Sequence, residues 1–235
     1  MKKMNLMWGL GLFSLCLFAS CSSSKKTEDK KLTERAHEDI KRDYTVIDSN
    51  AEVRPGWIQD AEIWAKNNEK DLDQFRYFSF ETEPKVSREI ACNLAQTNSR
   101  ADIAAEIATF IEKKLGTSIE GQGALDENNP HVKALKEFTE NTLAEKVQGF
   151  VRGASVVKSY WEKRAYKEDL GAKQDYSAYT CAVLVRFENK RLAKAIDQAA
   201  EQVIKNTDDA ATKENVKKAL NNVDDDFIKA RRGEI

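Results

Sequence analysis

The segment from Tyr176 to Phe187 constrains the fold most, because its side chains alternate in character. One set of every second residue is apolar or aromatic: Tyr179, Cys181, Val183, Val185 and Phe187. Successive side chains of a β-strand point to opposite faces of the sheet, so this pattern predicts a half-buried strand. Ala154 to Lys167, rich in β-branched and aromatic residues, predicts a second strand. The charged loop between the two segments makes them a hairpin.

A further strand and a long helix are predicted upstream. Phe75 to Phe80 is aromatic, and Pro84 closes this strand because proline cannot donate to a ladder. Ser87 is a candidate N-cap for a helix from Arg88 to Leu115, with Gly116 as its stop. The apolar face of this helix recurs at spacings of three and four: Ile90, Leu94, Ala101, Ala104, Ala108, Ile111 and Leu115.

Two other helices complete the pattern. Pro130 suits the first position of a helix that continues from Val132 to Val147, and Leu192 to Val203 has helical apolar spacing. The resulting order is β-α-α-β-β-α. We therefore expect an α+β fold, in which a small antiparallel sheet of about three strands has helices packed on one face.

The N-terminus has the pattern of an export signal. Lys2 and Lys3 precede an uncharged, apolar stretch from Met4 to Ser20, which is at the short limit for a membrane-spanning helix. Small residues at positions 19 and 20 precede Cys21, as in the lipobox of a bacterial lipoprotein. We expect cleavage before Cys21, lipid on its sulfur, and anchoring in the outer membrane facing the periplasm, since Ser22 rather than Asp follows. An ordinary secretory peptide and an uncleaved membrane helix are the alternatives.

These patterns divide the chain into four parts. Residues 1–20 are the expected lipoprotein signal peptide, and residues 21–54 are the lipidated cysteine with a flexible polar tether. A globular α+β domain is expected from residue 55 to residue 205. Residues 206–235 are expected to form a polar, weakly helical tail.

Composition and motifs argue against several classes of function. The chain has 38 Lys and Arg against 39 Asp and Glu, mixed in sequence, which indicates a solvated surface and no nucleic-acid partner. His37 and His131 are isolated, and no metalloprotease, serine-hydrolase or phosphate-loop motif occurs. Asp224 to Asp226 lacks the spacing of a calcium loop. We expect no catalytic residue, no metal site and no cofactor.

Two cysteines remain after the signal peptide and the lipidated residue are set aside. Cys92 shares a helical face with Ile103 and Ile107, and Cys181 points to the same side as Val183. If the helix packs on this strand face, the sulfurs can form a disulfide that closes a loop of about ninety residues and stabilises the fold by roughly 4 kcal/mol. The alternative is two small buried thiols that fill space. The sequence leaves both open.

Several strings of the chain match a known family: Pro55-Gly56-Trp57-Ile58, Ala91-Cys92, Ala95, Arg100-Ala101, Ile103-Ala104 and Tyr179-Thr180-Cys181-Ala182-Val183-Leu184-Val185. They resemble the LPP-twenty lipoprotein family, whose domain is similar to the N-terminal domain of a flagellar assembly protein. The resemblance covers about residues 55–205. It implies a small α/β or α+β domain, anchored to the outer membrane, with no known enzymatic site. Cys21 is the only functional residue that it carries over.

The leading hypothesis is a non-enzymatic envelope lipoprotein that binds an envelope protein partner. We expect its binding surface to be an apolar patch beside the edge of the sheet. A carrier of small ligands is one alternative, and it would need an enclosed apolar cavity. The other is an enzyme of the cell envelope that uses two facing carboxylates.

Overall fold

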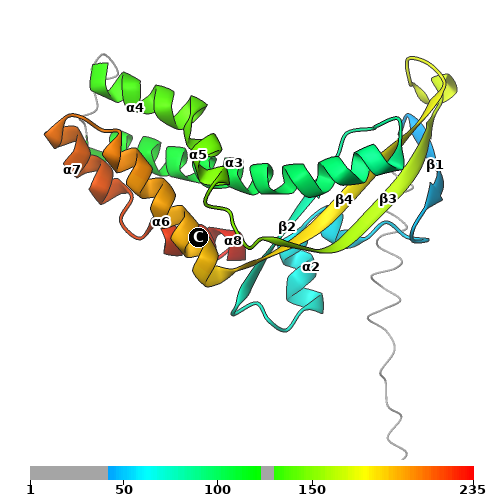
Figure 1. Ribbon diagram of the computed structural model, residues 1–235, viewed down its shortest axis with the longest axis horizontal. Coiled ribbons are helices and arrows are strands. Elements are labelled where there is room, and N and C mark those ends of the chain that lie inside the picture. Colours follow the sequence, from blue (N-terminus) through cyan, green and yellow to red (C-terminus); the bar gives the residue numbers. More distant parts are fainter. Residues whose placement is uncertain (1–41, 123–129) are drawn as a thin grey trace, which may run out of the picture. The chain divides into compact units, whose positions relative to one another are not determined.

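The structure is a computed structural model that describes residues 42–122 and 130–235 (Figure 1). Residues Arg42–Ile235 form one compact unit. Its elements, in order, are β1 (Tyr44–Ser49), η1 (Gly56–Ile58), α2 (Ala61–Asn68), β2 (Phe75–Glu81), α3 (Arg88–Gln122), α4 (Pro130–Asn141), α5 (Leu143–Gln148), β3 (Ser155–Tyr166), η2 (Glu168–Leu170), β4 (Tyr176–Glu188), α6 (Asn189–Lys205), α7 (Ala210–Ala219) and α8 (Val223–Arg232).

The sheet is antiparallel and has four strands in the order β1-β3-β4-β2. The predicted hairpin is present, since β3 and β4 pair from Tyr166 opposite Tyr176 to Ser155 opposite Arg186. The predicted aromatic strand is β2, which pairs with the other side of β4. The expected α+β class is confirmed, and the expected count of three strands is one too low.

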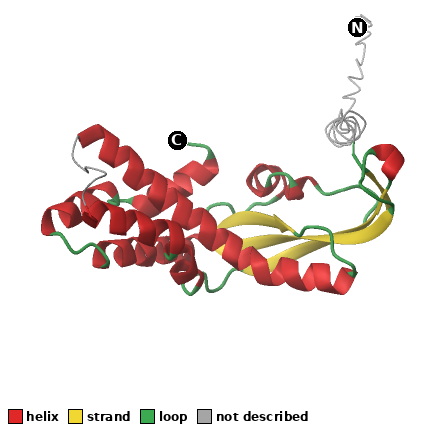
Figure 2. Ribbon diagram, turned by 90° about the horizontal axis from the view of Figure 1, so that it is seen from above, coloured by secondary structure: helices red, strands yellow, loops and turns green. Residues whose placement is uncertain are grey.

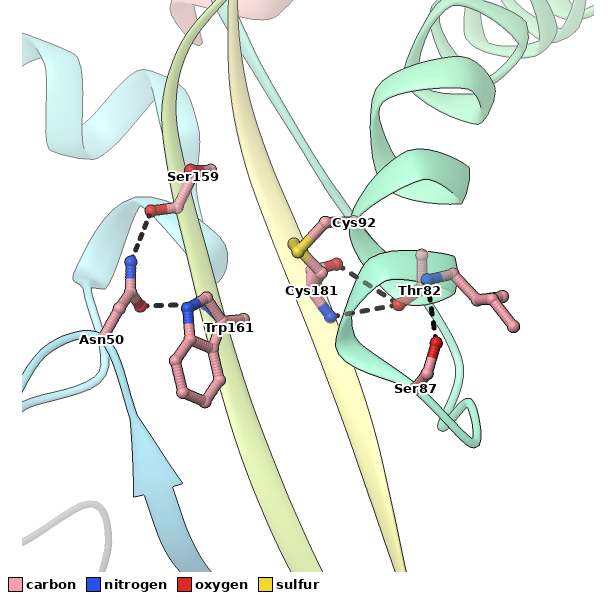
Figure 3. Close-up of a disulfide and its surroundings, with 8 residues drawn as sticks. Asn50, Thr82, Ser87, Cys92, Ser159, Trp161 and Cys181 are labelled. Atoms are coloured by element: carbon pink, nitrogen blue, oxygen red, sulfur yellow. Dashed lines mark hydrogen bonds between the residues drawn. A yellow bond between two sulfur atoms is a disulfide. The ribbon is translucent and has the colours of Figure 1, made fainter.

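The additional strand, β1, lies within the segment that was predicted to be a tether. It pairs with β3 from Tyr44 opposite Tyr166 to Ser49 opposite Glu162, with a bulge at Ile47. Asn50 fixes the end of this pairing: its side-chain amide donates to Ser159 O (3.2 Å) and accepts from Trp161 N (3.0 Å), as Figure 3 shows. The predicted tether of residues 21–54 is therefore wrong from Tyr44 onward.

Helix α3 covers one face of the sheet. Ser87 caps it as predicted, with Ile90 N donating to Ser87 Oγ at 3.2 Å. The helix does not stop at Gly116 but continues to Gln122. Because glycine only weakens a helix interior by about 1 kcal/mol, the flanking residues carry the helix through. Its buried face packs in the main core cluster, with Ile103, Ala104, Ile107 and Ile111 from α3 and Phe78, Val183, Val185 and Phe187 from the sheet.

The opposite face of the sheet is also covered (Figure 2). Trp57 from η1 is 3% exposed. It forms a second cluster with α2 and the strands: Ala61, Ala65, Tyr77, Tyr160, Ala182 and Leu184. The prediction of helices on one face is therefore wrong. It failed because α2, with only 8 residues, has too short an apolar pattern to be recognised.

The predicted polar tail of residues 206–235 is wrong as well. Helices α7 and α8 occupy this segment, and their apolar residues belong to the main cluster: Val216, Leu220, Val223 and Phe227. The acidic run at Asp224 starts α8, where carboxylates favour the helix dipole. The predicted helix from Val132 to Val147 is divided at Thr142 into α4 and α5. The globular domain thus spans Arg42–Ile235 rather than residues 55–205.

Candidate functional site

The two cysteines that the sequence brought to one face are joined in the structure. Cys92 in the first turns of α3 and Cys181 in β4 form a disulfide, with their Cα atoms 5.0 Å apart (Figure 3). Thr82 holds the adjacent backbone, because Thr82 N donates to Cys181 O (2.9 Å) and Cys181 N donates to Thr82 Oγ1 (3.1 Å). Of the two alternatives, the structure has the disulfide. Cys21 lies outside the described residues.

The outer edge of β2 is closed by side chains. Gln74 and Phe78 face β4, so the main-chain N–H and C=O of Tyr77 point away from the sheet. Glu62 Oε1 from α2 accepts from Tyr77 N (3.3 Å), and Arg231 from α8 donates to Tyr77 O (2.6 Å). A carboxylate and a guanidinium thus take the places that a neighbouring strand would occupy.

The outer edge of β1 has no such cover in the part of the chain that the structure describes. Lys167 N donates to Asp43 O (3.0 Å), so Asp43 faces β3. The alternation of an antiparallel ladder then turns the main-chain groups of Tyr44 and Val46 outward. Val46 is 45% exposed and Ile47 is 54% exposed. An open strand edge with exposed apolar side chains is a template for pairing with another chain.

A cleft of about 710 Å³ lies where α2, α3 and α8 meet, and acids of two of these helices line it. Arg231 donates to Glu106 Oε1 (3.0 Å), and its Nε lies 4.0 Å from Glu62 Oε1. Burial raises the pKa of both glutamates, and the charge of Arg231 acts in the opposite direction. Both acids therefore share one cation, and Glu62 also binds the edge of β2. This arrangement holds α8 against the sheet.

A second buried charge network lies on the α2 face of the sheet. Glu162 is 1% exposed and accepts from Tyr160 (2.8 Å), Arg164 (2.6 Å) and Arg54 (3.1 Å). The two arginines also pair with Glu81 on β2. Burial opposes the charge of Glu162, but the hydrogen bond from Tyr160 and the arginines outweigh it and lower its pKa. The network ties β3, β2 and the residue-54 loop together.

Sequence reasoning found neither network, because the partners are far apart in the chain. The aromatic and β-branched pattern of β3 located the strand but gave Glu162 no particular role. Likewise, nothing local links Glu62, Glu106 and Arg231. The disulfide was within reach of sequence analysis because each cysteine lay on a face already defined by its neighbours.

Within residues 42–122 and 130–235, no three His, Cys, Asp or Glu side chains come together in a group that could hold a metal ion. No helix in the same residues is long and apolar enough to cross a membrane. His131 lies at the start of α4, and His37 is outside the described residues.

Comparison of the chain with models of protein families, with curated proteins and with solved structures found no match. The resemblance to the LPP-twenty family therefore stays a prediction. The edge of β1 is the candidate site, because in the described residues its outward main-chain groups pair with no other strand and apolar side chains beside them are exposed.

Proposed function

We propose that this protein is an exported lipoprotein of the bacterial envelope that acts as a non-enzymatic binding or assembly module. In this proposal, lipid on Cys21 anchors it in the outer membrane, and the domain faces the periplasm. The partner is an envelope protein, which contributes an extended segment that pairs with β1. The observation that carries the proposal is the contrast between the two edges of the sheet.

The contrast matters because an exposed strand edge is a hazard that proteins normally suppress. At β2, Glu62 and Arg231 satisfy the outward groups of Tyr77. At β1, the described residues supply no such side-chain partner for the outward groups of Tyr44 and Val46, and Val46 and Ile47 are exposed. Main-chain hydrogen bonds to an added strand would give affinity, and contacts with Val46 would give specificity. The segment that binds should therefore be extended and carry apolar residues at alternate positions.

The disulfide supports the exported location. Disulfides persist in oxidising compartments such as the periplasm and are rare in the cytosol. A chain with a basic start, an apolar stretch and a cysteine after small residues is directed to that same kind of compartment. Cys92–Cys181 and the N-terminal pattern are independent features, and both favour export.

The enzyme alternative rests on Glu62 and Glu106, the acids that line one cleft. A general acid and a general base need different environments, so that one is protonated while the other is charged. Here burial shifts the pKa of both acids in the same direction, and both contact Arg231. The cleft therefore supports a structural role more strongly than acid–base catalysis.

The anchor is tested by processing and fractionation. Mass analysis of the mature protein should give an N-terminal lipidated Cys21, and the protein should sediment with outer membranes. Cys21→Ala should move it to the soluble periplasmic fraction. A mature start at another residue, or membrane sedimentation that Cys21→Ala leaves unchanged, would contradict the anchor.

The binding edge is tested by site-specific crosslinking in cells. A photo-crosslinker in place of Thr45 should capture an envelope protein, and Val46→Lys should abolish this capture because a charged side chain blocks edge pairing. Val86→Lys is the matched control, since Val86 is 85% exposed and lies outside β1. With the captured partner added, amide exchange at Val46 should slow. Equal capture by both lysine variants, or unchanged exchange, would argue against β1 as the site.

A further inference from the structure

Two open clefts lie on either side of the loop that joins α5 to β3. Their volumes are about 770 Å³ and about 570 Å³, and both are lined by Gly149 and Arg152. Volumes of this size are within the range of small-molecule sites. Arg152 lines both clefts, so a ligand in either cleft can contact it.

Four cations from three parts of the fold line these clefts. Arg100 comes from α3, Arg152 from the loop, and Arg191 and Lys194 from α6. No Asp or Glu is among the described residues that line either cleft. Over the whole chain, by contrast, basic and acidic residues number 38 and 39. The chain as a whole is nearly neutral, so the positive charge at these clefts is a local concentration.

Most of this charge is available to a ligand. Within residues 42–122 and 130–235, Arg100 and Lys194 make no hydrogen bond or ion pair, and both are exposed. Arg152 uses Nε to donate to Gly149 O (3.0 Å), which leaves its two terminal amino groups. Arg191 pairs with Glu188 through Nε (3.0 Å). Among the residues that the structure describes, three of the four cations therefore have no carboxylate partner.

The loop from α5 to β3 holds Arg152 in a defined position and contacts Arg191 of α6. Val151 and Ala154, on either side of Arg152 and Gly153, are 2% and 5% exposed and pack in the main cluster. Gly153 has a φ of +93°, which favours glycine. A Cβ at this position would lie 2.5 Å from a terminal nitrogen of Arg191. The guanidinium of Arg191 thus lies directly against Gly153, the residue that follows Arg152 in the loop.

We propose that these two clefts bind a phosphate-bearing ligand, either the headgroup of an anionic phospholipid or a soluble phosphate compound. The planar guanidinium fork matches phosphate and forms charge-assisted hydrogen bonds with it. Neutral donors also line the clefts, among them Gln96, Gln148 and Gln198. Four cations over two adjoining clefts suit a ligand with more than one negative charge. The proposal is independent of the lipid anchor and of the β1 edge.

The test uses the Arg42–Ile235 segment, because it contains both core clusters and the disulfide. Calorimetric titration with inorganic pyrophosphate is one arm. Sedimentation with vesicles of phosphatidylglycerol and phosphatidylcholine, compared with phosphatidylcholine alone, is the other. Binding in the first arm assigns a soluble phosphate ligand, and binding only to the anionic vesicles assigns a lipid headgroup. In both cases, affinity should fall as the salt concentration rises. No binding in either arm overturns the proposal.

Arg100→Gln/Arg152→Gln should weaken binding about tenfold or more, because each charge-assisted hydrogen bond contributes substantially. Lys217→Gln/Lys218→Gln removes the same amount of charge from α7, outside both clefts. If direct contacts rather than the net charge of the protein set the affinity, this variant should change the affinity by less than about twofold. Equal weakening in the two variants overturns the proposal. If the first variant unfolds, Arg100→Glu replaces a side chain without a partner in the described fold, and should abolish binding with unchanged circular dichroism.

Discussion

Removal of the Cys92–Cys181 disulfide tests the packing of α3 on the sheet. The two cysteines are 89 residues apart in sequence, and they join the first turns of α3 to the middle of β4. For a closed loop of that length, the chain-entropy relation gives a loss of about 4.5 kcal/mol when the bond is absent. At roughly 2–4 °C per kcal/mol for a domain of this size, the midpoint of thermal unfolding should fall by about 9–18 °C.

The assay compares three samples of the Arg42–Ile235 segment by thermal and urea unfolding: the oxidised protein, the same protein in reductant, and Cys92→Ala/Cys181→Ala. The reduced protein and the double variant both lack the crosslink. They should differ from one another by about 1–2 kcal/mol at most, because the two alanines lose only the packing of the two sulfurs, of which Cys181 is buried and Cys92 partly buried.

Two results would refute this reasoning. If reductant leaves the unfolding midpoint unchanged while alkylation shows free thiols, the crosslink contributes nothing and the entropic argument fails. If both thiols of the denatured, unreduced protein react with an alkylating agent, the bond is absent. Wild-type protein kept in reductant throughout purification is the control for oxidation during the assay.

Three further predictions concern residues that only the structure brought into view. Phe227→Ala should lower the free energy of unfolding by about 3–5 kcal/mol in urea titrations, because Phe227 is 2% exposed in the core; a change below about 1 kcal/mol would restore the interpretation of a loose tail. Glu162→Gln should cost about 3–5 kcal/mol at pH 7, because it leaves Arg54 and Arg164 without their buried partner. The lowered pKa of Glu162 stabilises the fold above its ordinary pKa of 4.5, and this contribution is lost as pH falls through the lowered value, so the cost of the substitution should shrink in acid; a cost independent of pH would contradict the charge network. The raised pKa of Glu106 affects stability in the opposite direction: the contribution of this group to the free energy of unfolding falls as pH rises above 4.5. Glu106→Gln should therefore make the free energy of unfolding depend less on pH in that range. An unchanged slope would show that burial does not perturb this acid.

Local patterns in the sequence were sufficient for the elements that carry their own signal. The strands β2, β3 and β4 have runs of aromatic and β-branched residues, and Ser87 supplies a cap that α3 uses. The face of β4, and that of α3 from Ala104 to Leu115, could be deduced from the periodicity of their side chains. The predicted face of the first turns of α3 is wrong, because Ile90 is 46% exposed and Ala91 and Ala95 are buried instead. Two cysteines on those faces then made a disulfide one of two reasoned alternatives.

The elements that were missed take their structure from distant partners. β1 is short and mostly exposed, and its pairing with β3 and the clamp by Asn50 make it a strand. α8 has a narrow apolar stripe, at Val223 and Phe227, which is too little to indicate a buried helix until α3 and α6 provide the surface for it. In both cases the local preference for a strand or a helix is weak, and packing against distant residues decides the structure.

The sequence by itself determined the α+β class, three of the strands, the course of the main helices and the faces on which Cys92 and Cys181 lie, because side-chain periodicity is a local property. The tertiary structure alone decided the fourth strand, the second covered face of the sheet, the helical C-terminus and the difference between the two edges of the sheet. Those features depend on contacts between residues more than one hundred positions apart, such as Tyr77 with Arg231. Periodicity along one segment carries no information about which distant segment will meet it.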